Sequence, residues 1–219
     1  MSLKNVDIQY DPNTRLGENF HVPYQNASMF ITLAISDWLR RQEVEIEKTN
    51  RIIFTEKKPQ IRLVGIVDKH VHVDVDDKFN SLAQFSNAEV THDYFKRKYI
   101  EGFKRFDAHF GLNLTPELEA FLDDYFKNGY VYEKEMKSKR ISGLKHQVLK
   151  QYKYDVFNLV LRVFDKTGAM IKETILQSGK PDPFLVHYNV NKVNIMDDKI
   201  QVLGSTGKIE TEHAIASVA

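Results

Sequence analysis

The stretch that decides the fold runs from Lys69 to Asp76 and reads KHVHVDVD. Valine alternates there with a polar residue over the full length of a strand. Because successive side chains of a strand point to opposite faces, the valines share one face and His70, His72 and Asp74 share the other. The pattern predicts a β-strand with one buried face, and it lines up possible metal ligands on the opposite face.

The composition favours a globular protein and excludes several classes of function. The chain has 219 residues, 42% of them hydrophobic, and its 14 Phe and 10 Tyr predict a core rich in aromatic rings. The formal net charge is +1, so no overall field attracts nucleic acid or a membrane surface. Cysteine is absent, which excludes disulfides, thiol catalysis and thiolate zinc sites.

The sequence shows neither a secretion signal nor a membrane span. Residues 1–7 lack an apolar core, and no apolar run approaches the ~20 residues that a membrane-spanning helix needs. We therefore expect a cytoplasmic protein, or one built into an assembled particle, that is not secreted and has no transmembrane segment.

The order of the predicted elements indicates the fold class. Strands dominate up to about residue 88 and again from 153 onward, and the insertion at about 89–152 is helical. Strands, then helices, then strands favour an α+β fold over alternating βαβ units. We expect one antiparallel or mixed sheet, built from both strand regions, with about three helices in the insertion and one helix before it.

The first strand region contains that earlier helix. Ser28 is a good N-cap, and Phe30, Ala34 and Trp38 follow at helical spacing. Two extended runs come next, at 51–55 and 60–76, and we expect an antiparallel hairpin or meander.

The insertion reads as a helical hairpin followed by a third helix. The first helix is expected from Thr91 to Gly111 and the second from Thr115 to Gly129, since each pair supplies an N-cap and a C-terminal glycine. Aromatic residues at steps of three and four mark the buried side of the first helix: Phe95, Tyr99, Phe103, Phe106 and Phe110. A third helix is predicted over roughly 133–151.

The last region is expected to form strands. Asp165–Gly168 predicts a hairpin turn between two strands, and further strands are expected at 184–190, 193–196 and 199–203. We predict a single domain, 1–219, with extended arms at 1–27 and 204–219, because both ends carry few residues that could anchor them to a core. Such ends become ordered when a neighbouring chain holds them.

Two short motifs around the histidines resemble metal sites. Gly65–His72, GIVDKHVH, resembles the first-strand motif of the amidohydrolase superfamily, and His70-x-His72-x-Asp74 resembles the opening of the metallo-β-lactamase motif. Both resemblances imply a divalent metal that activates water for hydrolysis. A small metal-dependent hydrolase using His70, His72 and Asp74 is therefore one hypothesis.

Other features of the chain favour a solvent-facing strand instead. An amidohydrolase barrel needs roughly 250 residues, and fewer than that follow His72. Val75 stands where the lactamase motif has its next histidine, and the chain holds no second histidine pair. The alternation also continues to Asp76 rather than ending at the histidines.

A basic segment at 134–153 supports a second alternative. Its seven Lys and Arg residues could grip phosphates, and Lys137, Lys139 and Arg140 would carry a nucleic-acid contact. A solvated helix face balanced by acidic neighbours is the simpler interpretation.

The hypothesis that we favour is a non-catalytic subunit of a larger assembly, such as a viral or phage particle, in which terminal arms lock onto neighbouring protein subunits. We expect protein partners in a homo- or hetero-oligomer, no cofactor and no catalytic residues. Nucleic acid is a less favoured partner, and no membrane contact is expected.

Overall fold

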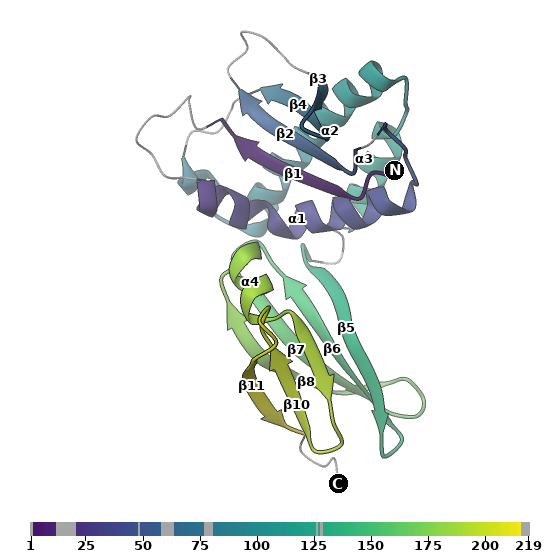
Figure 1. The fold of residues 1–219 in the computed structure, drawn as a ribbon, viewed down its shortest axis with the longest axis vertical. Helices are drawn as coiled ribbons and strands as arrows, with labels where there is room; N and C mark the ends of the chain where they lie inside the picture. Colours follow the sequence, from purple (N-terminus) through teal and green to yellow (C-terminus); the bar gives the residue numbers. More distant parts are fainter. Residues whose placement is uncertain are drawn as a thin grey trace. The chain divides into compact units, whose positions relative to one another are not determined.

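The valine-rich stretch forms strand β4 (His70–Asp76), and Val71, Val73 and Val75 are buried as the alternation predicts. The computed structural model describes residues 2–11, 21–47, 49–57, 64–76, 81–125, 127 and 129–215. The chain divides into two units, residues 1–132 and 133–219. Figure 1 shows the elements of each unit.

In the first unit, four strands form one mixed sheet. They are β1 (Asn5–Tyr10), β2 (Arg51–Lys57), β3 (Val64–Val67) and β4, in the order β1-β2-β4-β3. β1 and β4 both run parallel to β2, and only β3 is antiparallel to its neighbour β4. The antiparallel hairpin or meander expected from the runs 51–55 and 60–76 is wrong for their mutual pairing, because β4 pairs with β2 in parallel. The second run itself contains an antiparallel pair, β3 with β4.

Three helices complete the first unit: α1 (His21–Arg41), α2 (Ala88–Phe110) and α3 (Thr115–Tyr125). α1 joins the parallel strands β1 and β2, packs on β1 and contacts α2, which packs on β4. The buried side chains of α2 are the predicted aromatic ones, Phe95, Tyr99, Phe103 and Phe106. The apolar face of the sheet is thus covered within this unit.

The ends of these helices follow local chemistry. α2 begins after Asn87, whose side chain accepts from the backbone of Val90, rather than at Thr91, and it ends at Gly111 as expected. Asp107 accepts hydrogen bonds from the backbone and hydroxyl of Thr115, so the buried Asp107 side chain links α2 to the start of α3. α1 begins at His21, ahead of the expected cap at Ser28.

The second unit contains two further sheets. β5 (Tyr132–Ile141, whose first residue belongs to the first unit), β6 (Leu144–Tyr152), β7 (Phe157–Phe164) and β8 (Met170–Gly179) form one, in that order. β9 (Lys192–Ile195), β10 (Lys199–Leu203) and β11 (Ile209–Ala214) form the other, in the order β11-β10-β9. The hairpin at Asp165–Gly168 is confirmed.

Two predicted elements of this region are wrong. The third helix is instead the hairpin of β5 and β6, since Ser142 and Gly143 both take left-handed backbone angles, φ 50° and 83°, which suit a tight two-residue turn. Residues 184–190 are largely helix α4 (Pro183–Asn189), because Asp182 caps it and Pro183 begins it.

The α+β class is therefore confirmed, with four α-helices and three sheets among the described residues, but the single sheet built from both strand regions is wrong. Each region finds its strand partners locally.

The described parts of the expected arms also belong to folded elements. Val6, Ile8 and Tyr10 of β1 are buried, and residues 209–214 pair with β10 as β11. Residues 12–20 and 216–219 lie outside the described residues.

Candidate functional site

A fully buried carboxylate lies at the carboxyl end of β2. Glu56 shares the helix-facing side of that strand with Ile52 and Phe54, and its exposed fraction is 0%. The Tyr94 hydroxyl lies 2.7 Å from both carboxylate oxygens, and the Tyr24 hydroxyl donates to one of them. We call these residues, together with Lys98, the Glu56 cluster.

Lys98 supplies the positive charge of the Glu56 cluster. Its Nζ lies 3.4 Å from the Glu56 carboxylate, and the lysine side chain is 4% exposed. A buried carboxylate is costly unless hydrogen bonds and a counter-charge compensate it, and the cluster provides both. Burial, and then the charge of Glu56, raise the pKa of Tyr24 well above its ordinary value. Tyr24 therefore stays a hydrogen-bond donor at neutral pH.

The end of β4 is tied to α2 by a second set of contacts. Lys98 also donates to the backbone carbonyl of Asp76, and Glu101 accepts from the backbone N–H of Asp76 at 2.9 Å. Arg105 donates to the backbone carbonyl of Asp74 and lies 3.2 Å from the Asp76 carboxylate. Three side chains of one helix thus hold the carboxyl end of this strand.

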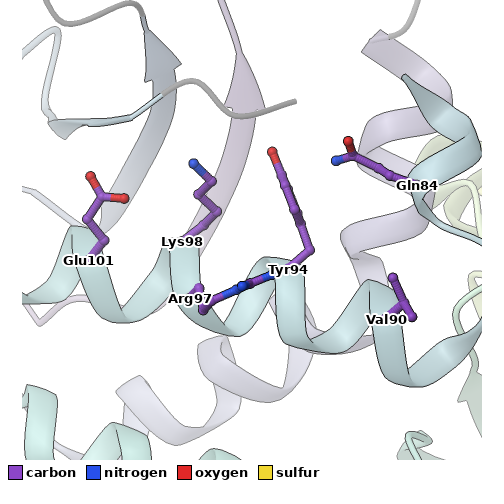
Figure 2. A pocket seen from close by; sticks show the side chains of 6 residues that line it. All are labelled: Gln84, Val90, Tyr94, Arg97, Lys98 and Glu101. Carbon is purple, nitrogen blue, oxygen red and sulfur yellow. The ribbon is translucent and has the colours of Figure 1, made fainter. Parts of the chain in front are cut away.

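A pocket of about 310 Å³ opens beside the Glu56 cluster. Figure 2 shows its lining, in which Tyr94, Lys98 and Glu101 rise from the same side of α2. The other lining residues are Gln84, Val90 and Arg97. The volume is at the lower end for small-molecule sites, and the carboxyl ends of parallel strands are where open α/β sheets bind ligands.

Charged side chains that line this pocket already have partners in the fold. Lys98 and Glu101 already bind Glu56, Asp76 and Arg105. The charged groups at the strand ends therefore hold the sheet against α2.

Sequence reasoning missed the Glu56 cluster. The extended run expected at 51–55 stops one residue short of Glu56, which continues the alternating inward residues Ile52 and Phe54. That alternation was a usable signal for its burial. Its partners, from α1 and α2, could not be read from local sequence.

The predicted His70 and His72 lie side by side on the face of β4 opposite the valines. Both are half-buried, and their ring centroids are 6.5 Å apart. Burial, and then the neighbouring His70, lower the pKa of His72. Asp74 is buried and pairs with Lys57 at 3.3 Å. Within the described ranges, no group of three His, Asp or Glu side chains is placed to hold a metal ion.

The basic residues proposed for nucleic acid lie on a strand instead of a helix. Lys137, Lys139 and Arg140 belong to β5, where residues of odd and even number point to opposite faces. The Arg140 side chain therefore lies on the face of the strand opposite to the two lysines. Lys139 also pairs with Asp197 at 2.9 Å.

An exposed apolar surface lies on α4 in the second unit. Phe184 is 74% exposed, and Leu185 and Tyr188 are about half exposed. The Phe184 and Tyr188 rings are stacked, with centroids 6.5 Å apart and planes 18° apart. We call these three residues the α4 patch.

Comparisons with protein-family models, with curated proteins and with solved structures found no match for this chain. No helix among the described residues is long and apolar enough to cross a membrane.

Proposed function

We propose that the chain is a non-catalytic subunit that associates with a second copy of itself through the α4 patch. The observation that carries this proposal is the 74% exposure of Phe184, a large apolar side chain stacked on a second exposed ring. Exposed aromatic residues that cluster are typical of protein–protein contacts, where such residues supply much of the binding energy.

The α4 patch stands on a well-anchored helix. Val186, on the other side of α4, and Val190, directly after the helix, are 4% and 0% exposed. The Asp182 carboxylate accepts from two backbone N–H groups at the start of the helix, and the backbone carbonyl of Tyr188 accepts from Ser205 at 2.8 Å. Because the platform is ordered before binding, association needs little further ordering of the backbone.

The chemistry of the α4 patch fits a second copy. In a contact with two-fold symmetry, each patch meets an identical patch, so flat rings meet flat rings.

The association is expected to be modest for an isolated pair. Specific, stable interfaces bury about 1,200–2,000 Å² in total, which three side chains on each copy cannot supply alone. A subunit that meets several neighbours in an assembly gains from many such contacts at once.

Sedimentation velocity over a concentration series tests the proposal. The wild-type chain should self-associate as concentration rises, and the double variant Phe184→Ser/Tyr188→Ser should sediment as a monomer. Truncating a central aromatic residue typically costs about 2 kcal/mol, or roughly thirtyfold in affinity. Met170→Ser, which removes another exposed apolar side chain of this unit (54% exposed), is the matched control and should behave like wild type. A wild-type monomer at every concentration, or equal association of the double variant, would overturn the proposal.

A further inference from the structure

A second pocket, of about 360 Å³, lies inside the second unit, where residues of both its sheets come together. His146 of β6, Leu161 and Val163 of β7, and Lys172 of β8 contribute from one sheet. His213 of β11 contributes from the other. None of the residues discussed above for association lines this pocket.

His146 is the unusual group in this lining. It is 3% exposed, and its Nδ1 atom has no hydrogen-bond partner among the described residues. A buried polar atom without a partner costs about 1–3 kcal/mol, and native proteins rarely leave one unsatisfied. A polar group of a bound molecule in the adjoining pocket would supply the missing hydrogen bond.

The residues next to His146 in the sheet indicate which other chemical groups such a molecule must have. His146 is directly opposite Val163, which is opposite Lys172 on the next strand. Residues opposite each other share a face of the sheet, so His146 and Lys172 flank Val163 on the side that lines the pocket. Their backbones are two strand spacings apart, roughly 10 Å, a gap that a lysine side chain can bridge.

The charges around the pocket favour an anion. Lys172 is the lysine of the lining, and His213 lies on the opposite wall, with its Nε2 3.2 Å from the Thr211 hydroxyl. The acidic residue of the lining, Glu212, is paired with Lys199 at 2.7 Å. Leu161 and Val163, 6% and 2% exposed, add an apolar wall.

We infer that this pocket binds a small organic acid, with its carboxylate between His146 and Lys172 and a short apolar body against Leu161 and Val163. The carboxylate accepts a hydrogen bond from His146 and a charge-assisted one from Lys172. The apolar body replaces water on the aliphatic wall. The inference is independent of the α4 patch.

Calorimetric titration of the full chain with hexanoate tests the inference, with 1-hexanol as the uncharged probe of equal length. Hexanoate should bind saturably, and hexanol should bind about tenfold more weakly, because the alcohol lacks the negative charge that Lys172 binds. Lys172→Ser and His146→Phe should each weaken hexanoate binding by about tenfold or more. Lys172 is exposed, so its variant stays informative even if His146→Phe disturbs folding.

Two control variants make the same kinds of substitution at a histidine and a lysine outside the pocket. His187→Phe, on the exposed side of α4, and Lys180→Ser, just after β8, should bind hexanoate like wild type. Absence of saturable binding at about 10 mM hexanoate would overturn the inference, since that corresponds to less than about 3 kcal/mol of affinity. Equal binding of hexanol would also overturn it.

Discussion

The Lys98 ammonium lies 3.4 Å from the Glu56 carboxylate, in a part of the first unit where both side chains are almost fully buried. The pair joins α2 to the carboxyl end of β2, and two tyrosine hydroxyls complete it. It is a buried polar link between a helix and the sheet, and its role can be measured.

Lys98→Met should destabilise the first unit, because it leaves a buried carboxylate without its counter-charge. The free energy of unfolding should fall by about 3 kcal/mol, as measured by urea denaturation. Adding Glu56→Gln should recover part of this loss, since a neutral amide needs no cation. Lys127→Met, which removes an exposed pair with Asp124, is the control and should cause no measurable change. Unchanged stability of Lys98→Met would contradict a structural role for the pair.

Gly102→Ala should destabilise the packing of α2 on the sheet. A Cβ atom at residue 102 would lie 2.3 Å from a ring carbon of the buried Phe54, so helix or strand must shift. Overpacking of this kind costs about 1–3 kcal/mol, although alanine favours a helix more than glycine does. Lys104→Ala, exposed on the same helix, should leave the thermal midpoint almost unchanged. A Gly102→Ala midpoint at or above wild type would mean that the close approach to Phe54 is relaxed without cost.

Two substitutions in the turn between β5 and β6 should change the free energy of unfolding in opposite directions. Gly143 has φ 83°, so Gly143→Ala should cost about 1 kcal/mol, since only glycine takes this angle freely. Ser142→Asn should gain a few tenths of a kcal/mol, since Asn-Gly is the favoured pair for this kind of turn. Chemical denaturation of both variants checks the prediction. If both changes had the same sign, the turn would not control the hairpin.

Stability should fall as pH drops from 6.5 toward 4, in part because of His92. Burial lowers the pKa of His92 from 6.5 to about 4. Between these values the unfolded chain takes up a proton that the folded chain does not, so protonation favours unfolding. The contribution is up to about 3 kcal/mol at pH 4 and absent above pH 7. His92→Gln should flatten the pH dependence of the urea midpoint in this window, whereas His187→Gln, at an exposed position, should retain the wild-type slope.

The sequence predicted the elements whose signals are local. The alternation of β4 gave its buried valines correctly, and the aromatic spacing of α2 and the hairpin at Asp165–Gly168 were also correct. The helix predicted at 133–151 was wrong because Met136, Ile141, Leu144 and Val148 fall near helical spacing by chance. Ser142 and Gly143 instead form a turn between two strands.

Pairing between distant segments could not be predicted in the same way. Whether β2 pairs with β4 in parallel depends on where β3 goes, which no local pattern specifies. The Glu56 cluster draws residues from β2, α1 and α2, and its formation depends on that pairing. The α4 patch was missed because a strand was expected there, and alternation would have buried half of its apolar side chains.

The absence of cysteine allows a direct test of association through the α4 patch. A chain with the single change Leu185→Cys can form a disulfide only with another copy. Met170→Cys is the control, because Met170 is another exposed apolar residue of the same unit. Under mild oxidation, Leu185→Cys should give a covalent dimer much faster than Met170→Cys, and adding Phe184→Ser should slow it. Equal rates of dimer formation for the two single-cysteine chains would contradict association through α4.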